Sequence, residues 1–551
     1  MFPKKGIRFD FWSFVGLVSL VIFLMFLIIP VGQMVLYAFQ ARDVDGFTIA
    51  NFTRFFERRF FRTAVTNSVS VVFLATILVT LIGVPLAYIT TNFKIRGRKL
   101  VDILIIISML SPPFLGAYSW ILLLGRNGLI TNLMGNVGVT IPNIYGFSGI
   151  LLVFTLRLYP FIYLFTKGAL KKVDASLGEA AESLGYSGIR KILTVSLPLV
   201  LPTILAGGTI VFLRAFADYG TPRLIGEGFH TLPVIIFQEW VSETGANAYF
   251  ASAVALIMMV IASCVFLLQK WISNRKSYTM NMLNPPQAKQ LHGVKNVLAH
   301  GYVYLLVFLS TLPQIYIIIS SFRNTRGVMW APGFGFSSYI AVFNRSLSSI
   351  LNTFRFGLVA IVCVVLLGTL FAYLTARRKT LLSKVLDVCI MFPFVIPGTV
   401  FGLILLMTYN TGPLVLSGTP AIIIIAFVIR RMPFTVRSSS AILRQISVSI
   451  EEASMSLGYS AMPTFFKVTM PVMIPGIISG AIISWITILG ELSTTLMIYT
   501  GRTQTMTVTI FQEISRGGFG TAAALSTILT VTMVLSLFLF FKISRSEDID
   551  L

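Results

Sequence analysis

The amino-acid sequence predicts an all-α polytopic membrane protein with twelve transmembrane helices, arranged as two tandem halves of six. Two observations predict this fold: the composition is too apolar for a soluble domain, and the chain repeats itself. Of the 551 residues, 56% are hydrophobic and 11% are charged, whereas soluble domains hold about 45–50% apolar and about 25% charged residues. The composition excludes a soluble domain, a disordered chain and a basic nucleic-acid-binding protein, despite the net charge of +23.

Twelve segments are apolar enough to span the bilayer as helices, which takes roughly 20 residues at about 1.5 Å each. They are continuous, so they do not fit the alternating strands of a membrane barrel, which are about ten residues long. The first is longer than the apolar core of a signal peptide, about 7–15 residues, so we expect an uncleaved span. The segments are 11–39, 66–90, 101–124, 147–166, 199–217, 251–271, 297–320, 352–376, 385–409, 420–438, 474–499 and 525–542.

The positions of lysine and arginine predict that both termini lie in the cytoplasm. With the N-terminus inside, the predicted inner segments hold 28 of these residues and the outer segments hold 13. Cytoplasmic loops carry such an excess. Arg157 and Arg214 fall within or close to predicted spans. An even number of spans places both termini on the same side.

The chain resembles itself at a fixed offset, which indicates a duplicated unit. Residues 179–187 match residues 452–460 at an offset of 273, and upstream the offset becomes 285, pairing Asn67 with Asn352. Each half holds six spans in the same order and orientation, so we expect a pseudo-twofold axis along the membrane normal. The predicted units are a first domain 1–271, a cytoplasmic linker 272–296 and a second domain 297–551.

The best-matched repeat lies in two predicted inner loops, 167–198 and 440–471. In each copy, Ser-x-x-Glu fits a capping box at the start of a short helix, and a glycine fits a left-handed helix end. A proline then favours a bend at the entry to the fifth span. One such helix could be purely structural, but two copies with the same spacing favour a shared docking partner. The residues are Ser176, Glu179, Gly185 and Pro198 in the first copy and Ser449, Glu452, Gly458 and Pro471 in the second.

The first copy, Glu179-Ala180-Ala181-x-x-x-Gly185, resembles the EAA signature of the permease subunits of binding-protein-dependent ABC importers. The second copy departs mildly, with Ala453 followed by Ser454 in place of a second alanine. The resemblance covers essentially the whole chain. It implies two tandem six-helix type I ABC importer permease domains, in which each loop forms a coupling helix that sits in a groove of a cytoplasmic ATPase.

No phosphate-binding Gly-x-x-x-x-Gly-Lys-Ser/Thr motif is present. The three histidines and three cysteines show no metal-ligand spacing. We therefore expect no catalytic residue, metal or cofactor in this chain, and no enzyme activity. The resemblance implies that ATP and Mg are bound by two copies of a separate ATP-binding subunit. It also implies an extracytoplasmic solute-binding protein, and a position in the lipid bilayer of the bacterial cytoplasmic (inner) membrane, with no nucleic-acid partner.

Asp218 and Glu491 occupy the same position in the two halves, near the outer end of each fifth span. Ionisable groups in spans are costly and mark functional candidates. One interpretation places both carboxylates, with Arg214, on a translocation path, where the acidic pair would attract a cation. The interpretation that we favour is local: each carboxylate caps a helix break or pairs nearby, for instance Asp218 with Arg214 four residues earlier.

Arg54, Arg58 and Arg62 recur every four residues in an outer segment, with phenylalanines between them. We expect one helical face at the membrane interface, with the aromatic rings in the membrane and the arginines at the headgroups. The alternative is a surface that grips acidic residues of a solute-binding protein.

Among such permeases, fused two-domain chains of this length resemble the ferric-iron importers. The matching stretches are 217–222, Ala-Asp-Tyr-Gly-Thr-Pro, and 490–495, Gly-Glu-Leu-Ser-Thr-Thr. Ferric iron is the expected solute, while thiamine, 2-aminoethylphosphonate and polyamine permeases share the architecture. An ion-coupled secondary transporter with two parallel halves is the alternative class, but it has no reason to carry the doubled loop.

Overall fold

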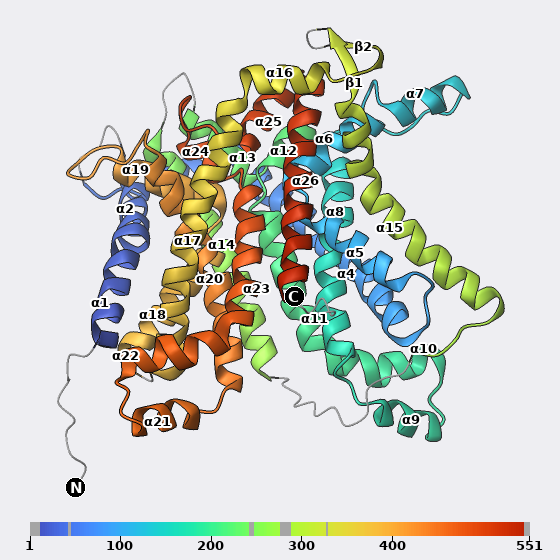
Figure 1. The fold of residues 1–551 in the computed structure, drawn as a ribbon. Coiled ribbons are helices and arrows are strands. Elements are labelled where there is room, and N and C mark those ends of the chain that lie inside the picture. Colours follow the sequence, from blue (N-terminus) through green and yellow to red (C-terminus); the bar gives the residue numbers. More distant parts are fainter. Residues whose placement is uncertain are drawn as a thin grey trace.

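The structure is a computed structural model that describes residues 11–41, 46–241, 247–275, 288–326, 329–378 and 380–544. The described part is an all-α bundle with one antiparallel hairpin, β1 and β2, at one end (Figure 1). The first half contains α1 (Phe11–Phe23), α2 (Ile29–Ala38), α3 (Ala50–Glu57), α4 (Arg59–Asn92), α5 (Arg98–Leu110), α6 (Pro113–Leu124), α7 (Leu129–Asn136), α8 (Phe147–Leu170), α9 (Ala175–Ser183), α10 (Gly188–Lys191), α11 (Leu197–Phe216), α12 (Gly220–Ile225), α13 (Leu232–Val241) and α14 (Ala248–Arg275).

The second half repeats this order after the linker. Its elements are α15 (Gly293–Ser321), β1 (Arg323–Arg326), β2 (Met329–Phe334), α16 (Ser337–Arg345), α17 (Leu347–Arg377), α18 (Leu381–Met391), α19 (Gly398–Tyr409), α20 (Pro420–Gln445), α21 (Ser449–Ser456), α22 (Ala461–Thr464), α23 (Met470–Leu489), α24 (Thr495–Ile498), α25 (Met506–Ser515) and α26 (Phe519–Ser544). Short π-helical turns join α1 to α2, α10 to α11 and α22 to α23.

Nine helical runs among the described residues are long and apolar enough to cross a membrane, or up to 11 if each of two bent pairs is one span. The remaining predicted segment, 420–438, is part of α20, whose first 18 residues hold Arg430, Arg431 and Arg437. Because of these three charges, α20 is not counted among the apolar spans, although the helix itself is present. All twelve predicted segments are thus helical over most of their length.

The third span of each half is broken, although the sequence predicts continuous spans at 101–124 and 385–409. Helix α5 meets the run Phe114–Asn136, which begins with α6, at 100°, and α18 meets α19 at 111°. Pro112 and Pro397 directly precede α6 and α19. Proline removes a backbone donor and disfavours the helical conformation of the residue before it, which explains both breaks. The predicted span 474–499 is also too long, because α23 ends at Leu489.

The first span of each half packs against the other half. Helix α1 contacts α17 and α18, and α2 contacts α19. The Trp12 ring stacks on Tyr373 with centroids 4.2 Å apart, and the Tyr409 hydroxyl donates to the carbonyl of Met25 at 2.6 Å. Helix α15 of the second half contacts α5 and α6 in the same way. The two sequence repeats are therefore interlocked in space (Figure 1).

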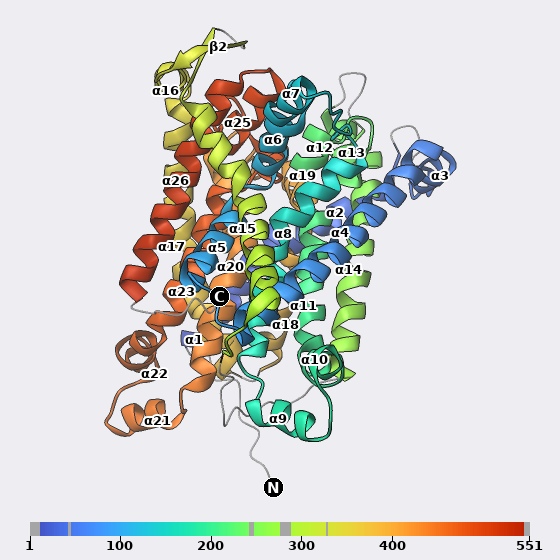
Figure 2. The ribbon, with the colours of Figure 1, turned by 90° about the vertical axis from the view of Figure 1, so that its right-hand side faces the viewer.

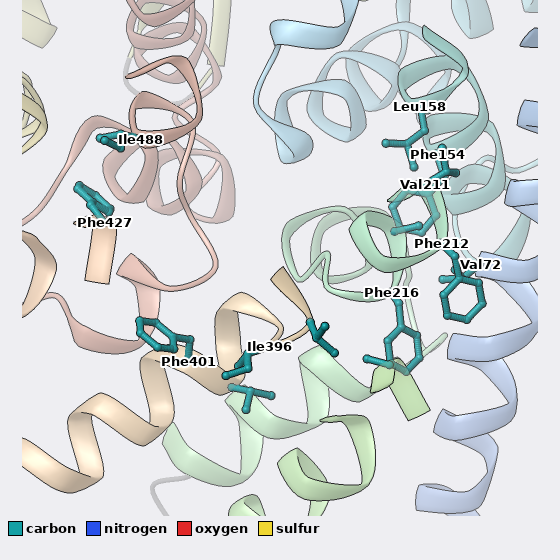
Figure 3. Packing of buried hydrophobic residues seen from close by; sticks show 14 of the residues in the cluster. Val72, Phe154, Leu158, Val211, Phe212, Phe216, Ile396, Phe401, Phe427 and Ile488 are labelled. Carbon is teal, nitrogen blue, oxygen red and sulfur yellow. The ribbon is translucent and has the colours of Figure 1, made fainter. Parts of the chain in front are cut away.

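Apolar packing holds each half together and also joins the two halves. Figure 3 shows Phe154 and Leu158 of α8 near Val211 and Phe212 of α11, all of them buried. Between the halves, buried residues that adjoin the ends of the fifth spans form one shared cluster. In that cluster the Tyr219 ring of the first half lies 5.7 Å from the Phe511 ring of the second, centroid to centroid.

Candidate functional site

Two short helices, α9 and α21, lie at the same end of the bundle, in the two predicted inner loops (Figures 1 and 2). The predicted capping boxes are wrong in both. In α9 the N-cap residue is Asp174, whose carboxylate accepts from the Ser176 amide at 2.9 Å. In α21 the N-cap residue is Val448, which makes no side-chain cap bond, and the Ser449 amide donates to the Ser447 hydroxyl at 3.3 Å. Aspartate is a strong cap residue, so Asp174 takes the cap position that was predicted for Ser176, while Ser449 is the first residue of α21 rather than its cap.

The predicted glycine ends of both helices are confirmed. Gly185 and Gly458 have φ of +81° and +93°, in the left-handed region. The Tyr186 amide donates to the Ala181 carbonyl at 2.9 Å, and the amide of Tyr459 makes the matching bond, so both ends form a Schellman motif. A β-carbon on either glycine would meet no atom within 4 Å, so only the backbone conformation requires glycine here.

We expect Gly185→Ala or Gly458→Ala to destabilise its short helix locally by about 1 kcal/mol, because an L-residue is strained in the left-handed conformation. Amide hydrogen exchange in α9 or α21 should then be faster, by the factor that corresponds to this loss of local stability. Gly168→Ala is the control, since Gly168 lies in α8 without a positive φ and with no atom within 4 Å of an added β-carbon. Equal exchange in the Gly185 variant and wild type would contradict the assigned role.

The repeated motif presents different sides to the bundle and to solvent. Ala181 and its counterpart Ser454 are buried, and the Ser454 hydroxyl lies 3.0 Å from that of Thr464. This hydrogen bond explains how serine replaces alanine at a buried position without an unsatisfied hydroxyl. The other motif residues face outward; they are Glu179, Ala180, Glu452 and Ala453.

Exposed apolar side chains beside the motif are functional candidates that the sequence reasoning missed. Leu184 and Leu457 are 77% and 81% exposed, and Leu177 and Ile450 are 43% and 45% exposed. Each pair is separated by 273 residues, so the signal was present in the repeat as matched apolar positions at both helix ends. Large exposed apolar side chains that recur together mark an interaction site.

The two short helices are anchored differently. Glu451 is buried, and it accepts from Arg377 Nε at 2.9 Å and from the Tyr373 hydroxyl at 3.0 Å. These bonds fasten α21 to the end of α17. Gly178 takes the place of Glu451 in the first half, so α9 has no such anchor.

Helix α9 is held instead by lysines. Lys191 Nζ lies 2.8 Å from Glu182 Oε1 and lowers the pKa of that carboxyl. Lys289 of the predicted linker lies 3.7 Å from the same oxygen, and its main chain pairs with Asn92 and Lys94. Residues 276–287 of the linker lie outside the described residues. Both lysine pairs are partly exposed, which makes this anchor weaker than a buried one.

Each half carries a buried ion pair between its fourth span and the end of its fifth. Arg157 Nη1 lies 2.8 Å from Asp218 Oδ2, and Arg430 Nη1 lies 2.9 Å from Glu491 Oε1. Arg431 also pairs with Glu491. Arg157 and Arg430 are related by the same offset of 273, so the repeat preserves the whole pair. The predicted pairing of Asp218 with Arg214 is wrong, because Arg214 lies over the Phe161 ring, 4.4 Å from its centroid.

The predicted capping role of the two carboxylates is confirmed. Asp218 Oδ1 accepts from the Thr221 amide at 3.0 Å, and Glu491 Oε1 accepts from the Thr494 amide at 2.9 Å. Each carboxylate thus spans the break between the long fifth-span helix and the short helix that follows it, α12 or α24. Irregular backbone at this depth is tolerated only where protein groups satisfy it.

Arg430 and Arg431 also change the charge count, because the 28 cations counted inside include them although both fall in the predicted span 420–438. Both lie within α20, and their side chains are 14% exposed. The inner segments keep their excess of cations without them. Four arginines, counting Arg157 and Arg214, therefore lie inside the bundle.

The outer cluster Arg54, Arg58 and Arg62 does not share one helical face. The chain turns at Arg58, where φ and ψ are −79° and 120°, so α3 and α4 are separate helices. Arg54 lies 3.8 Å from Glu239 and 4.2 Å from the centroid of the Phe250 ring. Arg58 and Arg62 stay exposed. A spacing of four residues predicts one face only while the helix is continuous.

A family model described as binding-protein-dependent transport system inner membrane component matches residues 80–278 and 364–545. The chain belongs to this family. Because the model matches twice, the permease holds two copies of the family's membrane domain, and each match includes one short helix, α9 or α21. The chain is a transport subunit rather than an enzyme, and it is a multi-pass protein of the inner membrane.

Curated relatives of this permease carry the names of transport proteins. The ferric transport system permease protein FbpB of Actinobacillus pleuropneumoniae is 27% identical over 96% of this chain and 77% of its own length. The Fe(3+)-transport system permease protein FbpB 2 of Haemophilus influenzae is 22% identical over 84% of this chain and 86% of its own. A protein of Salmonella paratyphi A, named for a 2-aminoethylphosphonate transport system permease, PhnV, is 28% identical over 44% of this chain and 90% of its own.

Proposed function

We propose that this permease forms the translocation path of an ABC importer for ferric iron. In this proposal an extracytoplasmic binding protein delivers the iron, and two copies of a cytoplasmic ATP-binding subunit, which bind ATP and Mg, drive transport. The observation that carries the proposal is the pair of helices α9 and α21, with matching glycine ends and exposed leucines at one end of the bundle. This end would face the cytoplasm, with both termini on the same side.

The helices that follow α9 and α21 offer a route from this end to the buried ion pairs. One continuous run, Gly188–Phe216, leads from the first loop toward Asp218, and a second, Ala461–Leu489, leads toward Glu491. Movement of α9 and α21 by closing ATP-binding subunits would therefore be transmitted to the point where the halves meet. Rigid-body rocking of one half against the other is the expected response.

The substrate assignment rests on the relatives named for ferric iron, which align over most of the chain. The relative named for 2-aminoethylphosphonate aligns with less than half of the chain, which makes a phosphonate the second candidate. Uptake into proteoliposomes that contain the permease, its ATP-binding subunit and its binding protein distinguishes them. We expect ATP-dependent uptake of ⁵⁵Fe(III), and no uptake of labelled thiamine or 2-aminoethylphosphonate. Uptake of another solute, without iron uptake, would overturn the iron assignment.

The exposed arginines at the start of α4 are proposed to contact the binding protein. Arg58→Glu should weaken binding of that protein by about tenfold at low salt, with a smaller loss at high salt, because exposed charges steer association and are screened. Surface plasmon resonance at two salt concentrations measures this. Arg444→Glu, an exposed change at the opposite end of the bundle, is the control. Wild-type affinity of the Arg58 variant at low salt would reject the contact.

A further inference from the structure

The buried charges between the two halves do not balance. Three guanidinium groups pair with two carboxylates between the fourth and fifth spans, and a fourth guanidinium, that of Arg214, is not in an ion pair, which leaves an excess of two positive charges. We call this set the arginine cluster. Its members are Arg157, Arg214, Arg430 and Arg431, with Asp218 and Glu491.

The excess positive charge has no partner among the residues that the structure describes. Arg214 is partly buried and lies over the Phe161 ring, no ion pair joins it to a carboxylate among the described residues, and the positive charges of the other three arginines act on it. The Nε atoms of Arg157, Arg430 and Arg431 are buried, and the described residues provide no hydrogen-bond acceptor for them. An uncompensated buried cation costs several kcal/mol, so this arrangement calls for a further negative charge.

The cluster lies deep in the bundle and at the contact between the halves. Arg157 is ten residues from the start of α8, or about 15 Å along the helix axis, which is about half the hydrocarbon thickness. A β-carbon on Gly220, two residues after Asp218, would lie 3.1 Å from Leu492 of the other half. Discontinuous helices at the interface of two repeats are where transporters bind solutes.

We propose that the arginine cluster is an oxyanion site, which receives a phosphate, phosphonate or carboxylate group as the solute passes. Guanidinium groups match these planar or tetrahedral oxyanions with paired hydrogen bonds. For ferric iron, an extension that rests on the proposed function, the ion would cross as an anionic complex, because an excess of positive charge repels the bare cation. This reverses the expectation that the acidic pair attracts a cation.

The test measures binding of ³²P-orthophosphate to the full-length protein in dodecyl maltoside, a detergent that contains no phosphate group. Arg214→Gln should weaken binding at least about tenfold, since a charge-assisted hydrogen bond contributes about 1.5–3 kcal/mol. Arg214→Lys should weaken binding less than Arg214→Gln, because lysine keeps the positive charge but cannot make the paired hydrogen bonds of a guanidinium. Arg126→Gln is the matched control, because Arg126 pairs with Glu227 at the surface. Size-exclusion profiles show whether each variant folds. Equal binding by wild type and a folded Arg214→Gln variant, or none by wild type, would overturn the proposal.

Uptake by the reconstituted complex separates this inference from the iron assignment. If ferric citrate enters equally with wild type and Arg214→Gln, the iron assignment stands and the oxyanion site is rejected. If wild type imports 2-aminoethylphosphonate but not iron, and Arg214→Gln abolishes that import, the oxyanion site stands and the iron assignment is rejected.

Discussion

Replacing Glu491 with glutamine is expected to lower the free energy of unfolding of the permease by about 3–5 kcal/mol, the usual cost of breaking a buried ion pair from one side. The carboxylate is the acidic partner of both Arg430 and Arg431, and all three side chains are nearly buried. Glutamine keeps the size of the side chain but leaves Arg430 and Arg431 without their shared carboxylate. Reversible unfolding of the purified protein by SDS in mixed micelles measures the loss.

A matched variant separates burial from charge. Glu227→Gln removes the acid of an ion pair with a 2.6 Å distance, but its side chains are 67% and 43% exposed, so we expect a loss below about 1 kcal/mol. Similar losses in the two variants would contradict the structural role of Glu491. Adding Arg431→Met to Glu491→Gln should recover part of the stability, because one uncompensated charge is removed.

The Glu491 pair also shows where sequence reasoning stops. From sequence alone, the ion-pair partners that can be proposed for a carboxylate are residues three or four positions away on the same helix. This rule predicted Arg214 as the partner of Asp218. The observed partner, Arg157, is 61 residues away. The repeat held the missing signal, since Arg157 and Arg430 stand at the offset that relates Asp218 and Glu491. In contrast, the length of the apolar segments predicts the spans, because the backbone N–H and C=O groups of a segment in the membrane must form hydrogen bonds within the protein, as a helix allows.

Features that depend on contacts between spans were not predictable from one sequence. Nothing local to residues 11–38 indicates that Trp12 stacks on Tyr373 of the other half. The breaks before α6 and α19 have a local cause in Pro112 and Pro397. Proline is also tolerated within membrane helices, so a proline alone does not predict that a span is broken. The glycine ends of α9 and α21 were predicted because a positive φ leaves few alternatives to glycine.

The double change Leu184→Asp and Leu457→Asp is expected to abolish ATP-driven uptake and to weaken binding of the ATP-binding subunit at least about 30-fold. Among the described residues, both leucines are among the most exposed apolar side chains, at 77% and 81%. They need a partner surface rather than the protein's own core, so the folded state should be unaffected. A residue that dominates an interface contributes about 2 kcal/mol or more, which corresponds to about 30-fold in affinity, and a charge in an apolar groove adds a desolvation cost.

The single variants test whether the two short helices contribute equally. Helix α21 is fixed by the buried Glu451 and is preorganised, whereas α9 depends on exposed lysine pairs. A preorganised element loses less entropy on binding, so Leu457→Asp should reduce uptake more than Leu184→Asp. Val137→Asp is the control for adding a charge to an exposed apolar position, because Val137 directly follows α7, which lies at the opposite end of the bundle (Figure 1). Copurification of the ATP-binding subunit at wild-type levels with the double variant would show that these leucines do not form the contact.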